Sequence, residues 1–289
     1  MHTGSLVCLV VTQPDRPSGR GLTLSPSPVK QAALALELSI TQPESIKNND
    51  EFRTQLTALK PDAIIVVGYG RILPQWMIDL PRLGNINLHA SLLPKYRGAA
   101  PIQWAIARGE EVTGVTTMRI DAGLDTGDIL LQKEIPVKPE DTAETLAPVL
   151  AAVGADIIVD TLHKLGTGTI KARPQDHEKA TLAPILKKED GRIDFRRTAE
   201  EICNRLRGFQ PWPGAFTTFR GKNLHFWEAA VSQRSLPPSE LLVESDLLFV
   251  GCGGNALAPL QVQPEGKKHM AARDFIHGYR PQSGEKLGS

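Results

Sequence analysis

Short apolar runs alternate with amphipathic stretches along the N-terminal half of the chain. Runs rich in Val, Ile and Leu predict buried strands at residues 5–12, near 40, and at 62–68, 85–90, 112–120 and 129–135. Between them, periodic segments predict helices at 28–38, 49–60, from 101 onward, and at 141–165, the last with a kink at Pro148. Ser27 followed by Pro28 is typical of a helix start. This alternation predicts an α/β fold with a parallel, doubly wound sheet.

The pattern changes near Gly166. Residues 166–191 combine Gly, Pro and mixed charge with little periodicity, which is typical of a linker. A helix is expected at 199–206. The remainder contains short strand-like runs, including AFTTFR, NLHFWEAAV and LLFVGC, separated by turn residues. This half therefore predicts a small all-β domain of barrel type.

Composition narrows the class of protein. A chain of 289 residues corresponds to about two domains. Its 41% hydrophobic and 22% charged residues are ordinary for a globular protein. No uninterrupted apolar run reaches about 18 residues, so we expect no membrane-spanning helix. Three scattered cysteines and no signal peptide favour the cytoplasm. A net charge of +1 restricts any nucleic-acid contact to local patches.

Polar residues interrupt the strand predicted at 85–90. If this segment is extended, Asn85, Asn87 and His89 share one face, whereas parallel strands are normally apolar on both faces. Burying such groups without partners costs roughly 2 kcal/mol or more each. Either the strand end opens into a ligand site, as carboxyl ends of strands in such sheets do, or the groups form a satisfied polar cluster.

A second polar segment, RIDAGLDTGDIL, places Asp121, Asp125 and Asp128 in a Gly-rich loop between two predicted strands. Its spacing does not fit an EF-hand calcium loop, and an ordinary turn cluster remains possible. Taken together with the first segment, the residues suit acyl transfer to an amine. His89 could accept the amine proton, Asn87 could donate to the oxyanion, and Asp125 could orient His89.

The motif Asn87-x-His89-x-Ser-Leu-Leu-Pro, followed by KYRGAAPIQWAI and GLDTGD, resembles the folate-dependent formyltransferases. TQPDRPSGRG, SPSPVK and GKKHMAARDF extend the resemblance, in order, over nearly the whole chain. The narrower resemblance is to members that formylate methionine on initiator tRNA with 10-formyltetrahydrofolate. It implies a Rossmann-like formyltransferase domain at 1–172, a linker at 173–181, and a C-terminal OB-like barrel domain at 182–289 that binds tRNA.

The resemblance also implies roles for individual residues. The catalytic set of the family matches Asn87, His89 and Asp125. Its folate-binding positions match Ser91, Leu92, Leu93, Pro94, Gly70, Ile72 and Leu73. Its tRNA-binding positions match Arg16, Arg20, Lys267 and Lys268, which would otherwise be solvated residues of loops and turns. We expect initiator methionyl-tRNA and folate as partners, no bound metal, no membrane contact and a monomer.

This chain departs from the family pattern at two places. Leu22 and Thr23 replace lysines that some relatives carry after the arginine matched by Arg20. MHTG stands where the family has a strand and a Gly-Thr-Pro turn, so we expect a chain shortened by one strand and one helix, with lowered stability. Two alternatives remain: formylation of a small amine such as an amino-sugar nucleotide, and an inactive truncated tRNA-binding fragment.

Overall fold

A computed structural model describes residues 5–18 and 23–288. The chain forms two compact units, each built from separate segments of sequence. The first unit comprises Met1–His89, Val115–Lys133 and Val153–Lys179. The second comprises Ala90–Gly114, Glu134–Ala152 and Ala180–Ser289.

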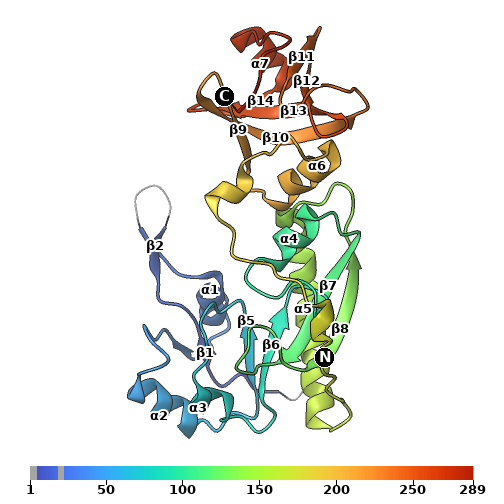
Figure 1. Cartoon of the computed structure of the whole chain (residues 1–289). Coiled ribbons are helices and arrows are strands. Elements are labelled where there is room, and N and C mark those ends of the chain that lie inside the picture. The colour runs from blue at the N-terminus through green and yellow to red at the C-terminus, as the bar shows by residue number, and fades with distance from the viewer. Residues whose placement is uncertain (1–4, 19–22, 289) are drawn as a thin grey trace. The chain divides into compact units, whose positions relative to one another are not determined.

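The main sheet of the first unit has the strand order β5-β6-β7-β8 (Figure 1). Its strands are β5 (Ile64–Val67), β6 (Asn85–His89), β7 (Val112–Arg119) and β8 (Ile129–Pro136). β5 and β6 pair in parallel, as predicted, whereas β6 and β7 pair antiparallel. Parallel pairing is therefore confirmed at β5 and β6, whereas the sheet as a whole is mixed.

Local sequence signals position the N-terminal helices. The Ser27 hydroxyl accepts from the Lys30 N–H at 3.1 Å and caps α1 (Pro28–Ala35). The Asn49 side chain accepts from the Phe52 N–H at 2.9 Å and caps α2 (Asp50–Ala58). A short helix, α3 (Gln75–Ile78), follows β5. Side-chain caps of this kind stabilise a helix by about 1 kcal/mol, and the cap at Ser27 is the one that the sequence predicted.

The strand predicted at residues 5–12 is much shorter than expected. Only β1 (Val10–Val11) is formed, paired in parallel with β4 (Ile40–Thr41). Leu6 is 89% exposed and Val7 55% exposed. A strand needs a ladder partner, and within the described residues β4 offers only two positions. The apolar composition of residues 5–12 therefore predicted a longer strand than the structure forms.

The longest helix, α5 (Ala143–Gly166), is long and apolar enough by length and composition to cross a membrane. Length and composition alone do not contradict the expectation that the chain has no membrane-spanning helix. One face of α5 packs against the sheet, as a core helix does. Gly154 lies against Leu88 of β6, and the buried Thr161 and Thr117 hydroxyls hydrogen-bond at 2.8 Å. One helix of this kind is weak evidence for a membrane.

The second unit contains an antiparallel sheet, which confirms the predicted strands, although the helix α7 (Ala272–Tyr279) shows that the region is not all-β. The strand order is β11-β12-β13-β10-β9, with β14 paired to β13. Its elements are β9 (Ala215–Phe219), β10 (Lys222–Ser232), β11 (Leu241–Glu244), β12 (Leu247–Gly251), β13 (Ala256–Pro264), β14 (Met270–Ala271) and α7 (Ala272–Tyr279). No pairing between β9 and β11 closes this sheet within the described residues.

Two helices of the second unit pack closely. Gly208, the last residue of α6 (Ala199–Gly208), lies against the backbone of α4 (Pro101–Ala107), where a Cβ would be 2.6 Å from the Gln103 carbonyl oxygen.

The predicted linker contains the short 3-10 helices η1 (His177–Lys179) and η2 (Lys188–Gly191). Backbone bridges such as Arg97 with Leu182 show that its chain packs against structured segments.

Candidate active site

The structure brings Asn87, His89 and Asp125 together. Asn87 and His89 lie on one face of β6, as the two-residue spacing predicted. The Asn87 amide nitrogen is 3.4 Å from Asp125 Oδ1, and His89 Nδ1 is 3.7 Å from Asp125 Oδ2. The His89 side chain is 6% exposed and that of Asp125 is 16% exposed. The three groups thus form one largely enclosed polar cluster.

The cluster depends on a loop that folds back onto β6. This loop, residues 120–128, joins β7 to β8, and Asp125 takes a left-handed backbone conformation with φ of 51°. Asp121 accepts from the Gly123 N–H at 3.0 Å and from the Thr126 hydroxyl at 2.8 Å. At Gly127, a Cβ would lie 2.0 Å from the Arg119 carbonyl oxygen, so glycine is required there. The Asp and Gly residues therefore shape the loop that presents Asp125.

Gln175 fastens this loop from a distant part of the chain, and the sequence analysis missed it. The buried Gln175 amide donates to the Asp125 carbonyl at 2.9 Å and to the Gly127 carbonyl at 2.7 Å. The residue lies in the segment interpreted as a linker. A single Gln among polar residues gives no sequence signal, because both contacts span about 50 positions. Gln175 is a positioning residue for Asp125.

Asn85 has a different role from its neighbours on the strand. Its side chain is buried and donates to the carbonyls of Met77 and Ile78 at 3.0 and 2.8 Å. It therefore anchors the start of β6 to α3. Its Oδ1 has no hydrogen-bond partner within the described residues. Asn85 therefore fits the interpretation of a satisfied polar cluster in part, because its amide nitrogen is hydrogen-bonded and its Oδ1 is not. Asn87 and His89 instead face Asp125.

The segment after β5 begins beside the cluster. Val66 and Val67 pair with Asn87 and Leu88, so the chain leaves β5 at the carboxyl end of β6. Gly70 is exposed with φ of 73°, and Ile72 is 93% exposed. Leu73, in contrast, is buried in a hydrophobic cluster with Phe52 and Met77. Of these three predicted folate positions, Gly70 and Ile72 are available to a ligand, and Leu73 supports the segment from beneath.

Residues 91–94, which follow β6 after Ala90, lie in a tight turn. The buried Ser91 hydroxyl donates to the Lys95 carbonyl at 2.6 Å, and the Leu93–Pro94 peptide bond is cis. Leu93 is buried, whereas Leu92 and Pro94 are half-buried. Ser91 thus holds the turn, and Leu92 and Pro94 are its more accessible apolar surfaces.

Three of the four predicted tRNA-binding residues lie within the described residues, and all three are exposed. Arg16 is exposed on β2 (Arg16–Ser18), which pairs with β3 (Thr23–Ser25). Arg20 lies outside the described residues. Lys267 and Lys268 are exposed in the turn between β13 and β14.

The described residues contain no group of three or more His, Cys, Asp or Glu side chains that could hold a metal ion. Cys8, Cys203 and Cys252 form no disulfide, and burial raises the pKa of Cys203 and of Cys252 to about 11. The cluster of Asn87, His89 and Asp125 offers an amide, an imidazole and a carboxylate. These groups suit proton transfer combined with stabilisation of an oxyanion.

Comparison with known proteins agrees with this chemistry. Residues 2–162 match the formyl transferase family, and residues 185–280 match the formyl transferase C-terminal domain. The chain is 68% identical, over its whole length and 93% of the relative's, to methionyl-tRNA formyltransferase of Koribacter versatilis (strain Ellin345). It is 57% identical to the enzyme of the same name from Acidobacterium capsulatum, over its whole length and 94% of that relative's.

Solved structures show the same fold at low sequence identity. An N-formyltransferase from Helicobacter canadensis, in complex with folinic acid and dTDP-3-aminofucose, matches with a TM-score of 0.62 and 18% identity over 88% of this chain and 87% of that one. HypX from Aquifex aeolicus, in complex with tetrahydrofolic acid, matches with a TM-score of 0.58 and 18% identity. That match covers 89% of this chain and 47% of HypX.

Proposed function

Because the chain belongs to the methionyl-tRNA formyltransferase family, we propose that it transfers the formyl group of 10-formyltetrahydrofolate to the α-amine of methionine on initiator tRNA. The product would be N-formylmethionyl-tRNA for translation initiation. The observation that carries the proposal within the structure is the cluster of Asn87, His89 and Asp125, which joins a base, an amide donor and an orienting carboxylate.

His89 is the proposed general base. Asp125 faces Nδ1, so it favours the tautomer with the proton on Nδ1, in which Nε2 carries the lone pair that accepts a proton. The amine nitrogen of methionine attacks the formyl carbon while Nε2 takes its proton. The resulting imidazolium is stabilised by the Asp125 carboxylate.

Asn87 is the proposed oxyanion donor. Attack turns the formyl oxygen into an oxyanion, and an amide N–H fixed in advance stabilises that charge more than it stabilises the starting carbonyl. The tetrahedral intermediate then collapses. The bond between the formyl carbon and N10 of the folate breaks, its electron pair goes to N10, and the proton held on His89 neutralises that nitrogen. The products are the formamide and tetrahydrofolate.

We propose that folate contacts Gly70, Ile72, Leu92 and Pro94, with Leu73, Leu93 and Ser91 shaping the same segments from within. The exposure of Ile72 and the half-burial of Leu92 and Pro94 support this assignment. A small-amine substrate has less support, because the sugar formyltransferase structures share only 18–21% identity with this chain and indicate the fold alone.

For tRNA we propose Arg16, Arg20, Lys267 and Lys268 as contacts. Beside Lys267 and Lys268, the Trp227 ring stacks on His269 with centroids 4.2 Å apart.

We further propose that the C-terminal sheet is an OB-like barrel, with the domains divided at 1–172, 173–181 and 182–289. The three free cysteines support a cytoplasmic protein, and we propose a monomer that works without a membrane.

A substrate comparison tests the proposed function. The purified chain is incubated with 10-formyltetrahydrofolate and either methionyl-initiator tRNA or a nucleotide-linked amino sugar, and the formylated products are measured by mass spectrometry. We expect formyl-methionyl-tRNA at a rate far above that of the formylated sugar. Preferential formylation of the sugar would overturn the proposal.

A further inference from the structure

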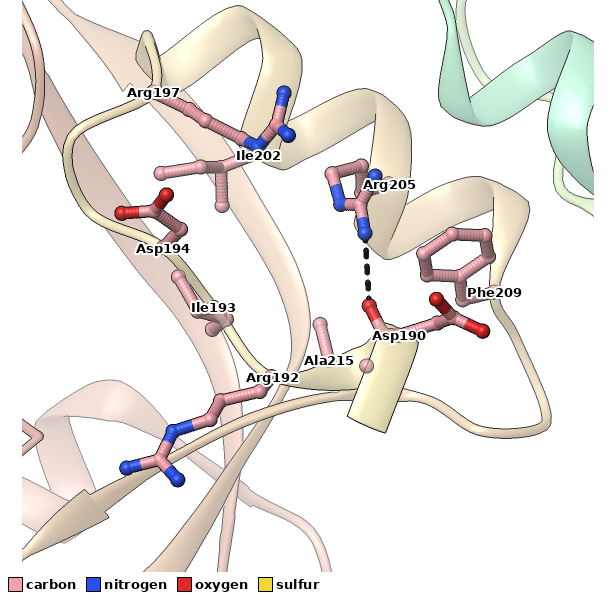
Figure 2. Close-up of a pocket in the computed structure, with 10 residues that line it drawn as sticks. Asp190, Arg192, Ile193, Asp194, Arg197, Ile202, Arg205, Phe209 and Ala215 are labelled. Atoms are coloured by element: carbon pink, nitrogen blue, oxygen red, sulfur yellow. Dashed lines mark hydrogen bonds between the residues drawn. The ribbon is translucent and has the colours of Figure 1, made fainter. Parts of the chain in front are cut away.

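A cavity of about 490 Å³ lies in the second unit, lined by α4, α6 and η2. Trp104 and Arg108 line it from α4 and its C-terminal end, Arg197 and Arg205 from α6 and the residues before it, and Asp190 from η2. Figure 2 shows the small neighbouring pocket that shares Asp190, Arg197 and Arg205 with this cavity. None of these residues belongs to the site assigned above.

Two of the arginines lack a carboxylate partner. Within residues 5–18 and 23–288, neither Arg108 nor Arg205 forms an ion pair. Arg205 donates to the Asp190 carbonyl at 2.9 Å, the bond drawn in Figure 2, and Arg108 donates to the Leu182 carbonyl at 3.1 Å. A guanidinium carries five N–H donors, so these bonds use a minority of them. The positive charge at this cavity is therefore not neutralised by a dedicated carboxylate.

The acidic side chains that line the cavity are already engaged elsewhere. The Asp190 carboxylate accepts from the Lys187 N–H at 2.7 Å. The Glu201 carboxylate accepts from the Thr198 N–H at 3.1 Å as the capping box of α6. Arg197 contacts Glu201 only at 3.5 Å. Each carboxylate thus accepts from a backbone N–H group, and together the two carboxylates offset the charge of the arginines in part.

Aromatic rings hold the arginines in place. The guanidinium carbons of Arg108 and Arg205 lie 5.5 and 5.8 Å from the Trp104 ring centroid. The indole itself is fixed by a hydrogen bond to the Pro184 carbonyl at 2.8 Å and by an edge contact with Phe209. A guanidinium held against a ring keeps its donor fork oriented, which reduces the entropy lost on binding an anion. Burial and the nearby charge of Arg197 lower the pKa of Arg205.

We propose that this cavity binds a phosphate group through Arg205 and Arg108, with Arg197 as a third donor, and that a backbone phosphate of the tRNA substrate is its ligand. The planar fork of arginine matches phosphate oxygens, and the cavity has the size of a site for a nucleotide unit. The choice of tRNA as the source of the phosphate rests on the proposed function, whereas phosphate binding itself does not.

The test compares the wild-type chain with Arg205→Gln and Arg108→Gln in two binding assays. The dissociation constant for initiator tRNA is measured between 50 and 200 mM salt, and inorganic phosphate and pyrophosphate are titrated calorimetrically. We expect each substitution to weaken tRNA binding about tenfold, the effect of a lost charge-assisted hydrogen bond. The slope of log affinity against log salt should fall by about one.

Arg234→Gln is the matched control. Arg234 also lies over a ring, 4.0 Å from the Phe249 centroid, but is paired with Glu244 outside the cavity. It should change neither assay. Because Arg108 is exposed, Arg108→Gln keeps the test valid even if Arg205→Gln fails to fold, which thermal melting would reveal.

The outcomes separate the two proposals. Loss of tRNA affinity in both arginine variants supports the tRNA phosphate. Arginine-dependent binding of inorganic phosphate, with unchanged tRNA affinity, supports the same site with a free anion as ligand. Absence of tRNA binding by the wild-type chain contradicts the proposed function. It leaves the measured binding of inorganic phosphate to the cavity unaffected. Wild-type affinity for both ligands in folded variants overturns the cavity proposal.

Discussion

His89 Nδ1 and Asp125 Oδ2 lie 3.7 Å apart, although 36 residues separate them in the sequence. His89 is the last residue of β6, and Asp125 lies in the loop at residues 120–128 with a left-handed backbone conformation. The short distance between them therefore depends on the conformations of two separate elements. The separation is longer than a strong hydrogen bond and within the range of an ion pair. It suits a carboxylate that orients the imidazole and stabilises it when it gains a proton.

Replacing Asp125 tests that relationship. Asp125→Asn keeps the shape but can present an N–H to Nδ1, which favours the tautomer with Nε2 protonated and unable to accept a proton. We expect kcat to fall at least 100-fold, the lower range of general-base effects. The folate dissociation constant, measured by fluorescence quenching, should stay within about twofold. An unchanged kcat would show that Asp125 does not orient the base.

Asn87→Ala removes the proposed oxyanion donor. Loss of one such donor typically lowers the rate by about 100- to 1,000-fold. Because the interaction strengthens only when the oxyanion forms, turnover should fall far more than folate affinity. Single-turnover kinetics and equilibrium folate binding measure the two effects separately. Equal losses in both would place Asn87 in ground-state binding instead.

Gln175 offers a test of loop positioning. In Gln175→Glu, carboxylate oxygen would face the Asp125 and Gly127 carbonyls in place of two N–H donors. We expect a loss of about 1–3 kcal/mol in the free energy of unfolding, the cost of leaving buried polar groups unpaired. We also expect a lower kcat at unchanged KM for tRNA.

The control for this substitution is Gln31→Glu. Gln31 also donates to a carbonyl, that of Pro26 at 3.1 Å, but it is exposed. Urea unfolding should show little change for this variant. Equal effects of the two substitutions would mean that the hydrogen bonds of Gln175 do not stabilise the loop more than an exposed hydrogen bond does.

Gly154→Ala probes the support beneath the site strand. Alanine ordinarily stabilises a helix by up to about 1 kcal/mol relative to glycine. At this position, however, a Cβ would lie 2.6 Å from Leu88 Cδ2, and Leu88 stands between Asn87 and His89. Overpacking of this kind costs about 1–3 kcal/mol, so we expect a lower urea midpoint and reduced activity.

Gly166 in the same helix is the matched position, because a Cβ there meets no atom within 4 Å. Gly166→Ala should raise the midpoint or leave it unchanged. The packing argument is contradicted if both substitutions stabilise the protein to the same extent.

The comparison of sequence and structure separates local from distant determinants. The start of α1 was predictable because Ser27 acts on an N–H group three residues away. The shared face of Asn87 and His89 followed from strand periodicity alone. Local patterns could not reveal that Asn85 turns to the carbonyls of α3, or that Gln175 holds the Asp125 loop, because both depend on tertiary contacts.

The most direct test is formyl transfer by the wild-type chain and by His89→Ala, assayed with 10-formyltetrahydrofolate and methionyl-initiator tRNA. Near-ultraviolet circular dichroism and folate binding would establish that both proteins are folded. We expect formyl-methionyl-tRNA from the wild-type chain and a rate at least 100-fold lower from His89→Ala, with folate affinity retained. Wild-type turnover by His89→Ala would contradict the assignment of the base, and no product from the folded wild-type chain would contradict the proposed function itself.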